Sequence, residues 1–255
     1  MSIRIQLATS YEACLALEDL QKTVWNMSEG YEPASTLLTI AKDGGIVLVA
    51  YEGGEAVGFV FGFIGRTASG RLKHSSNMMG ILPEYRSQGL GERLKREQAR
   101  IALSQGLDLM TWTFDPLQTP NAYLNISKLG AKVFRYYPNL YGEMLGINAG
   151  ISSDRFEAHW ELKEQETAPE RPKQRVYYPL SKHLSIDGDM PWIHIEVPKD
   201  FQALKAGDLI KAQAYRQGTA QLFQEAFALG FVVNRLIVGE EACYYQLERS
   251  STASP

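Results

Sequence analysis

The residues best suited to chemistry lie between Met78 and Leu94, where an apolar strand runs into a glycine-bearing loop that opens a helix. The first turn of a helix has unpaired backbone N–H groups and a positive partial charge, so an anion bound there gains several hydrogen bonds. Gly89 and Gly91 lack a Cβ atom, which lets the backbone approach a ligand closely. The pattern predicts a pyrophosphate-binding site, and an ordinary strand-to-helix turn is the alternative.

The spacing of this loop differs from two common nucleotide-binding motifs. From Arg86 to Gly91 it is Arg-x-x-Gly-x-Gly, whereas the dinucleotide fingerprint is Gly-x-Gly-x-x-Gly and the P-loop ends in Gly-Lys-Ser/Thr. The helix that follows is predicted to bury one apolar stripe, made of Leu90, Leu94 and Ile101. Its opposite face is predicted to carry charged residues, namely Glu92, Lys95 and Arg96.

Strands and helices alternate around this loop, which indicates an α/β fold with a mixed sheet. The strands are expected at Ile3–Leu7, Ile46–Tyr51, Ala56–Ile64, Met78–Leu82 and Asp108–Phe114, and the helices at Tyr11–Met27, Pro33–Ala41, Leu90–Gln105 and Pro120–Gly130. The second and third strands flank a short Gly-Gly turn and should form an antiparallel hairpin, and 66–76 reads as a loop. The strands on either side of the long helix should be parallel, with the glycine loop at the ligand-binding edge.

The composition changes after Trp160. Residues 163–175 are charged and contain prolines, which indicates a linker or an excursion between a first domain, residues 1–162, and a C-terminal α/β half-domain, residues 176–255. The half-domain is expected to hold a strand at Trp192–Val197, a helix within Leu204–Leu229, and strands near Phe231–Val238 and Ala242–Leu247. Its order of strand, proline, helix, glycine and strand suggests a degenerate copy of the first unit without the glycine loop.

The composition favours a soluble globular protein whose partners are small molecules rather than nucleic acids. Of the 255 residues 45% are hydrophobic, 29 are acidic and 26 are basic, and the net charge of −3 argues against a nucleic-acid partner. The start of the chain has neither a secretion signal nor a membrane span, so we expect the cytoplasm and no membrane partner. Cys14 and Cys243 are expected to be free thiols. The histidines, at positions 74, 159, 183 and 194, show no metal-ligand spacing, so no metal is expected.

About the first three fifths of the chain resembles the GNAT superfamily of acyl-CoA-dependent N-acyltransferases. The resemblance rests on the strand, the run Pro83-Glu84-Tyr85-Arg86, the glycine loop, the helix and the run Lys128-Leu129-Gly130. The runs His74-Ser75, 111–118 and Asn121-Ala122-Tyr123 are similar to a bacterial group of predicted GNAT acetyltransferases whose substrates are poorly known. The resemblance implies a GNAT-like fold that binds acetyl-CoA or another acyl-CoA as co-substrate.

By position, the resemblance implies which residues hold the coenzyme. Arg86 would open the motif. The pyrophosphate would be bound by the backbone N–H groups of Ser87, Gln88, Gly89, Leu90, Gly91 and Glu92. The pantetheine would pair with the strand at Met79, Gly80 and Ile81, because in the family this strand and the one ending near Phe114 splay apart. The side chains of Met79 and Ile81 can still pack in the core. Asn121 would bind the coenzyme or support its own helix start.

The reaction needs a neutral amine, a stabilised oxyanion and a proton for the leaving thiolate. In the family a tyrosine two residues before the lysine of Lys-x-Gly often supplies that proton, and Ile126 stands there in this chain. Tyr123, one helical turn earlier, or water would replace it. Candidate bases, in order, are His74, Asp115 and Glu84. Each has an alternative without a catalytic role: His74 as a loop residue, Asp115 as a turn-forming residue before Pro116, and Glu84 as a solvent-exposed charge.

Aromatic residues could line the acceptor pocket or pack in the core, and core packing is favoured for Trp112, Tyr136, Tyr137 and Tyr141. The chain is therefore expected to transfer an acyl group, most simply acetyl, from coenzyme A to a small amine such as an amino acid by direct attack. A non-catalytic acyl-CoA binding or sensing module is the alternative. The C-terminal unit is expected to pack on the first domain and to shape either the acceptor site or a homodimer.

Overall fold

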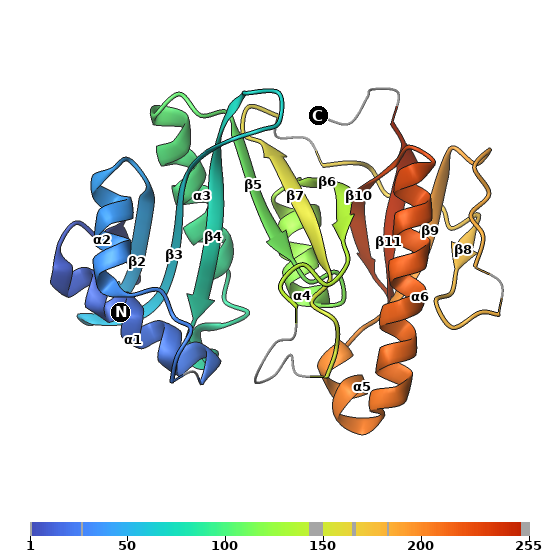
Figure 1. Cartoon of the computed structure of the whole chain (residues 1–255), viewed down its shortest axis with the longest axis horizontal. Coiled ribbons are helices and arrows are strands. Elements are labelled where there is room, and N and C mark those ends of the chain that lie inside the picture. The colour runs from blue at the N-terminus through green and yellow to red at the C-terminus, as the bar shows by residue number, and fades with distance from the viewer. Residues whose placement is uncertain (1, 27, 143–149, 165–166, 183, 251–255) are drawn as a thin grey trace. The chain divides into compact units, whose positions relative to one another are not determined.

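The computed structural model describes residues 2–26, 28–142, 150–164, 167–182 and 184–250. By internal contacts the chain divides into two compact units (Figure 1). Unit 1 comprises Met1–Trp112 and Glu161–Lys163, and unit 2 comprises Thr113–Trp160 and Glu164–Pro255. The boundary at residue 162, expected from the change in composition after Trp160, stays a prediction. His183 and the expected helix end at Met27 lie outside the described residues.

Unit 1 carries most of the predicted elements of the first domain (Figure 1). They are β1 (Arg4–Leu7), α1 (Tyr11–Trp25), α2 (Ala34–Lys42), β2 (Ile46–Glu52), β3 (Glu55–Arg66), β4 (Leu72–Ile81), the 3-10 turn η1 (Pro83–Tyr85), α3 (Leu90–Ser104) and β5 (Leu109–Phe114), whose last two residues belong to unit 2. The strand order is β1-β2-β3-β4-β5. The first four strands are antiparallel and β5 is parallel to β4, so the predicted hairpin, the parallel pair and the mixed α/β fold are confirmed.

Helices cover both faces of the unit 1 sheet. Val47, Val49, Phe59 and Phe61 pack in one buried cluster with residues of α1 and α2. Side chains alternate along a strand, and β2 is buried at successive positions from Ile46 to Ala50, so its other face must also be covered. Helix α3 contacts β2, β3 and β4 and supplies that second layer (Figure 1). The glycine loop therefore precedes a helix that is held in place by its packing on the sheet.

Two expectations about unit 1 are wrong. Strand β4 begins at Leu72 rather than at Met78, because it pairs with β3 from Arg66↔Leu72 onward, and the loop before it is correspondingly short. The pairing shifts between Phe61↔Met78 and Gly62↔Ser76, so Asn77 is an extra residue, a β-bulge that interrupted the pattern expected of a strand. On α3, Leu90 and Leu94 are buried and Arg96 is exposed as predicted, whereas Lys95 is buried on the inner face and Ile101 is only half-buried.

Unit 2 holds the rest of the chain (Figure 1). Its elements are α4 (Thr119–Ala122), the π-helical turn η2 (Tyr123–Lys128), β6 (Lys132–Tyr137), β7 (Arg155–Glu161), β8 (Val176–Tyr177), β9 (Trp192–Pro198), α5 (Phe201–Gly207), α6 (Leu209–Ala228), β10 (Phe231–Val238) and β11 (Ala242–Arg249). Their strand order is β7-β6-β10-β11-β9-β8. The sequence analysis left β6 and β7 unassigned.

The predicted resemblance between the C-terminal unit and the first strand–helix–strand unit holds for element order but fails for topology. Strand β11 pairs antiparallel with both β9 and β10, so it lies between these two strands. In unit 1, by contrast, β4 and β5 on either side of α3 are direct neighbours. The segment after residue 163 is held against the sheet, since Arg171 N–H donates to Gln246 Oε1 and Gln246 Nε2 donates to the carbonyl of Pro169. Through these hydrogen bonds, the segment lies against strand β11.

The core of unit 2 is aromatic. Phe156 of β7 makes edge-to-face contacts with Phe223 of α6, at 4.7 Å between centroids, and with Tyr245 of β11, at 5.4 Å. Gly218 lets α6 approach the backbone of Pro179, because a Cβ there would lie 2.0 Å from that carbonyl oxygen.

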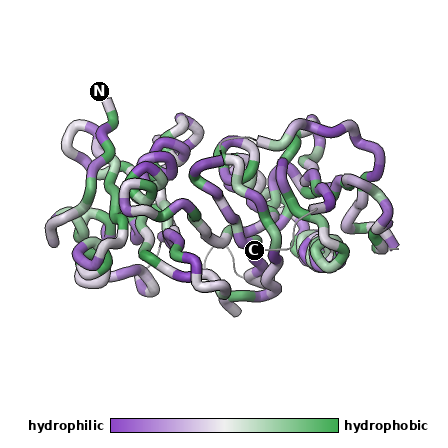
Figure 2. The backbone as a smooth tube through the Cα atoms, turned by 90° about the horizontal axis from the view of Figure 1, so that it is seen from above, coloured by the Kyte–Doolittle hydropathy of each residue, from purple (hydrophilic) through white to green (hydrophobic). Residues whose placement is uncertain are grey.

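Hydrophobic stretches along the backbone are short and interrupted by hydrophilic ones (Figure 2). In agreement with this pattern, none of the helices in the described ranges has the length and apolar character needed to cross a membrane.

Candidate active site

The glycine loop has the conformation of an anion-binding turn. Ser87 and Gly89 both have positive φ angles, 60° and 79°, and Gly89 is the N-cap of α3 without a side-chain cap. Two side chains stabilise the loop from within: Arg86 Nε donates to the Ile81 carbonyl at 3.0 Å and Gln88 Nε2 donates to the Glu84 carbonyl at 2.7 Å. The loop is therefore shaped by its own residues.

The backbone donors of this loop remain available to a ligand. Among the described residues, the N–H groups from Ser87 to Gly91 donate to no protein acceptor. A Cβ built at Gly89 would meet no atom within 4 Å, so the space in front of the helix start is open. Consecutive free N–H groups at the positive end of a helix bind phosphate oxygens well.

Strands β4 and β5 separate next to this loop. They pair at His74↔Met110 and Ser75↔Thr111, and no further pair between them occurs in the described parts of either strand, although β4 continues to Ile81 and β5 to Phe114. We call the point of separation, at Ser76 and Trp112, the fork. Beyond the fork, β4 presents a strand edge that an extended ligand could pair with.

The family model of the acetyltransferase (GNAT) domain matches residues 43–125, which run from just before β2 to the start of η2 and include the loop and the fork. This segment of the chain is similar to a GNAT acetyltransferase domain. Among curated proteins, no sequence matches the chain.

Solved structures show the same fold. One is yncA of Salmonella typhimurium with its cofactor acetyl-CoA, with a TM-score of 0.51, 19% identity and coverage of 67% of this chain and 99% of that one. Another is the GNAT-family acetyltransferase of Streptococcus pneumoniae, with a TM-score of 0.50, 16% identity and coverage of 62% and 98%. The ribosomal-protein-S18-alanine N-acetyltransferase of Escherichia coli has a TM-score of 0.50, 13% identity and coverage of 67% and 99%. These structures share the fold of this chain, and about a third of the chain lies outside its alignment with the Salmonella typhimurium structure.

Within the GNAT domain, His74 is buried rather than placed in a loop. It lies in β4, is 0% exposed, and its ring packs against Gly62, where a Cβ would come within 2.6 Å of Nε2. Burial, with a further contribution from the charge of Lys95, lowers the pKa of His74 to about 3. Such a weak base in the core is a poor acceptor for a proton from an alkylammonium.

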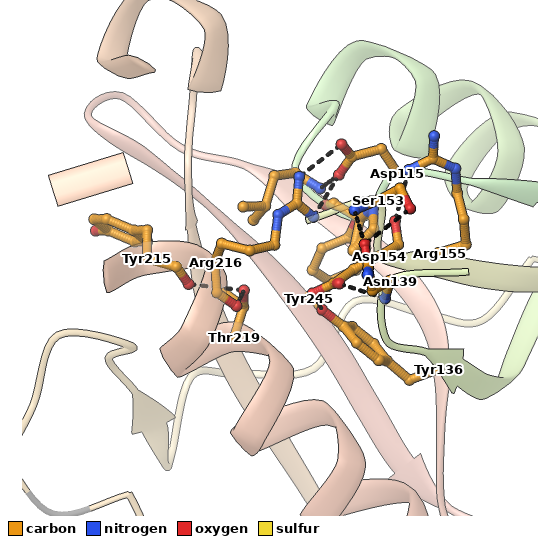
Figure 3. Close-up of polar contacts among 12 residues, drawn as sticks. Asp115, Tyr136, Asn139, Ser153, Asp154, Arg155, Tyr215, Arg216, Thr219 and Tyr245 are labelled. Carbon is orange, nitrogen blue, oxygen red and sulfur yellow. Dashed lines mark hydrogen bonds and ion pairs between the residues drawn. The ribbon is translucent and has the colours of Figure 1, made fainter. Parts of the chain in front are cut away.

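Asp115, the second candidate base, is held in a buried ion pair in unit 2 (Figure 3). Arg216 donates to Asp115 Oδ1 at 2.8 Å and to Oδ2 at 2.7 Å, and the N–H of Leu117 donates to Oδ1 at 2.8 Å. Both carboxylate oxygens are therefore occupied, which argues against Asp115 as the base and for a structural role. Glu84, the third candidate, is exposed in η1.

The candidate acid and the last coenzyme residue lie in unit 2. Tyr123 is 39% exposed at the start of η2, so its hydroxyl is accessible, while Ile126 is fully buried. Asn121 is exposed and its Oδ1 accepts a hydrogen bond from Asn125 Nδ2 at 3.2 Å, which fits support of its own helix. The roles of these residues stay predictions.

The aromatic residues divide between core and surface. Trp112 is 7% exposed, and Tyr136 is buried with its hydroxyl donating to Asp154 Oδ2 at 2.5 Å (Figure 3). Tyr141 is 56% exposed and forms a hydrogen bond with Thr113 at 2.8 Å. The core packing that the sequence favoured therefore fits Trp112 and Tyr136 but does not fit Tyr141.

Sequence reasoning missed two buried cations, Lys95 and Arg216, each 3% exposed. Lys95 was predicted on the charged face of its helix, and no expectation was drawn for Arg216 from the sequence. Both cysteines are buried and free, and within the described ranges no three His, Cys, Asp or Glu side chains gather in the way a metal site requires.

Proposed function

We propose that this chain transfers an acyl group, in the simplest case acetyl, from coenzyme A to the amine of a small molecule such as an amino acid. The observation that carries the proposal is the set of free backbone N–H groups from Ser87 to Gly91, presented at the start of α3 beside the fork. The pyrophosphate would bind these donors, and the pantetheine would lie along β4 at Met79, Gly80 and Ile81.

The acyl transfer proceeds by direct attack of the amine on the thioester. The departing thiolate takes a proton from Tyr123, whose hydroxyl is accessible, or from water. The neighbour from Escherichia coli is named for the alanine of a ribosomal protein, so small-molecule and peptide acceptors are tested side by side. A panel of free amino acids, small amines and short peptides, scored by release of coenzyme A, separates a small acceptor from a protein acceptor. Turnover confined to peptides would contradict the small-molecule acceptor.

Binding of coenzyme A is tested with a glutamate at the start of α3. Gly89→Glu places bulk and negative charge where the pyrophosphate would lie, and it should abolish binding of acetyl-CoA measured by titration calorimetry. The matched control is Gly106→Glu. Gly106 has nearly the same φ, 80° against 79°, and equally open space, but it follows the other end of the same helix, about 22 Å away.

The two glutamates carry the same backbone strain, so they should cost similar stability while only Gly89→Glu loses the ligand. Unchanged acetyl-CoA affinity in Gly89→Glu would contradict the proposed cradle, and equal loss in both variants would show a folding defect.

A non-catalytic acyl-CoA sensor is the second candidate. One reason is that a buried Ile126 stands where the family often has a tyrosine that acts as the acid. Another is that neither leading candidate base is available, because His74 is buried and Asp115 is held in an ion pair. Incubation with acetyl-CoA or succinyl-CoA and the amine panel distinguishes the two: a sensor binds without releasing thiol, and an enzyme releases it.

A further inference from the structure

A buried polar cluster lies at the fork, inside unit 1. Lys95 reaches from α3 and donates from Nζ to Ser76 Oγ at 2.7 Å, and Ser76 in turn donates to Gln98 Oε1 at 2.8 Å. The ammonium also stands 3.9 Å from the centre of the Trp112 ring. Lys95, Ser76 and Gln98 are 3%, 6% and 0% exposed, so this hydrogen-bonded chain runs through the interior.

The position of the cluster follows from the strand register. Ser75 and Thr111 form the last pair between β4 and β5, so Ser76 and Trp112 are the first residues after the strands part. Lys95 contacts both of them and therefore lies beside the fork, on the face of the sheet that α3 covers. If coenzyme A binds as proposed above, its thioester enters the gap between the strands, with the pyrophosphate at the other end of β4.

The cluster has hydrogen-bonding capacity that the protein does not use. Within the described residues, Gln98 Nε2 and both ring nitrogens of His74 are buried without a hydrogen-bond partner. Orphaned buried polar groups cost stability, and they concentrate where function requires them. A purely structural core would favour apolar residues at these positions.

The electrostatics of the cluster suit proton transfer. Burial lowers the pKa of Lys95 to about 7. The groups that face it are Ser76 and His74 from β4, Trp112 from β5 and Gln98 from α3, and His74 is kept neutral by its own burial. An amine that changes protonation near neutral pH can accept and release a proton during turnover.

We propose that Lys95 and Ser76 form a proton relay at the fork that removes the proton from the acceptor ammonium before it attacks the thioester. The inference rests on the proposed function and names a proton path that replaces the three candidate bases from the sequence. Lys95 acts through the Ser76 hydroxyl, with which it shares a hydrogen bond, rather than directly on the acceptor, and is therefore a positioning residue.

The steps balance as follows. The ammonium gives a proton to Ser76 Oγ while the Ser76 hydroxyl proton, turned from Gln98, passes to neutral Lys95 Nζ. The free amine then forms a bond to the thioester carbon, the C–S bond breaks as the tetrahedral intermediate collapses, and the second nitrogen proton goes to water. The thiolate is protonated by water, or by Tyr123, which then regains a proton from water, and Lys95 returns its proton through Ser76 to solvent.

The test compares Lys95→Met, Ser76→Ala and Arg100→Met. Methionine keeps the length and apolar stem of lysine in the core. Arg100 is an exposed cation on the same helix and serves as the control. For each protein, coenzyme A affinity is measured by calorimetry and kcat/KM by thiol release from pH 5.5 to 9, with acetyl-CoA and the best amine of the panel.

The expected result is a wild-type rate that rises with pH and levels off above about 7. Lys95→Met should lower kcat/KM by about 100-fold or more and lose this inflection, and Ser76→Ala should lower it in the same way. Both should bind coenzyme A within about twofold of wild type, as should Arg100→Met, which keeps full turnover.

Other outcomes overturn the relay. A Lys95→Met protein with wild-type turnover, or with reduced turnover and an unchanged inflection, shows that Lys95 is structural. Wild-type protein that binds coenzyme A without releasing thiol overturns the relay in favour of a sensor. Absence of coenzyme A binding in wild type overturns the proposed function as well, so the two failures are distinguishable.

Discussion

Arg216 in α6 forms a bidentate ion pair with Asp115 (Figure 3). Asp115 directly follows β5 and lies 101 positions earlier in the sequence. The guanidinium is 3% exposed, and its charge is balanced at 2.7–2.8 Å by the two carboxylate oxygens. A residue far outside the matched family segment thus fixes the loop that follows the last strand of that segment. Within unit 2, the C-terminal region therefore holds the end of the matched segment.

Breaking this pair on one side should be costly. Arg216→Leu leaves the Asp115 carboxylate, whose side chain is 13% exposed, without its cation, and removal of one partner of a buried ion pair typically destabilises by about 3–5 kcal/mol. Arg216→Leu combined with Asp115→Leu should recover much of that loss, since no unpaired charge remains. Urea unfolding of both variants, with Arg100→Leu as an exposed control expected to cost less than about 1 kcal/mol, measures the difference. A single variant as stable as the control would contradict this account of the pair.

Deletion of everything after Glu164 should give an insoluble protein. The truncation removes Phe223 and Tyr245, which cover Phe156 of β7, and it strands Asp115 without Arg216. Exposed aromatic surface of this kind drives aggregation. Soluble expression and the circular dichroism spectrum are the readouts. A soluble, fully active truncation would show that residues 165–255 neither complete the core nor shape the acceptor site.

His74 should make the protein acid-sensitive. Its pKa is lowered to about 3 in the fold, against about 6.5 when unfolded, so below pH 6.5 the unfolded chain binds a proton that the native chain does not. Stability from this group is therefore full above pH 6.5 and is lost as the pH falls toward 3. At pH 5 the loss is about 2 kcal/mol, at about 1.4 kcal/mol per pKa unit.

The corresponding variant is His74→Leu, which cannot titrate. Relative to wild type it should gain about 2 kcal/mol on moving from pH 7.5 to pH 5, and the comparison at pH 7.5 removes the effect of altered packing. Parallel stability curves for the two proteins across this range would show that His74 does not titrate differently in the two states.

Tyr123 should affect catalysis without affecting coenzyme binding. If its hydroxyl protonates the thiolate, Tyr123→Phe should lower kcat by about 100-fold and leave the acetyl-CoA affinity unchanged, because the missing group acts only as the C–S bond breaks. The side chain is exposed, so loss of folding stability should be small. Unchanged kcat would assign the proton to water.

The sequence predicted the elements that follow strong periodicity and failed where buried polar residues interrupt it. The hairpin β2–β3, the parallel pair around α3 and the glycine loop all follow from apolar runs punctuated by glycine and proline. The start of β4 was missed because His74, Ser76 and the bulged Asn77 carry polar side chains in a strand. Lys95 was placed on the wrong face of α3 for the same reason, since a charge in an amphipathic pattern normally marks solvent.

The site residues show the same division. The conformation of the loop depends on backbone and glycine, which sequence spacing reveals directly. The environment of a titratable side chain depends on what packs around it, and neither the burial of His74 nor the pairing of Asp115 with Arg216 is visible within a local window. Interactions across a hundred residues require the fold.

The buried Lys95 should make the protein less stable at neutral pH than it is in mild alkali. Its pKa is lowered to about 7 in the fold, against about 10.5 when unfolded, so between these values the unfolded chain holds a proton that the native chain has released. The penalty for the buried ammonium is full below pH 7 and fades as the pH rises toward 10.5. At about 1.4 kcal/mol per pKa unit its upper bound is about 5 kcal/mol. Lys95→Met should therefore be more stable than wild type at pH 6, and this advantage should shrink steadily toward pH 10 in urea unfolding followed by fluorescence. A constant difference across that range would mean that Lys95 keeps its ordinary pKa in the fold, and the relay would then lack the neutral amine on which it depends.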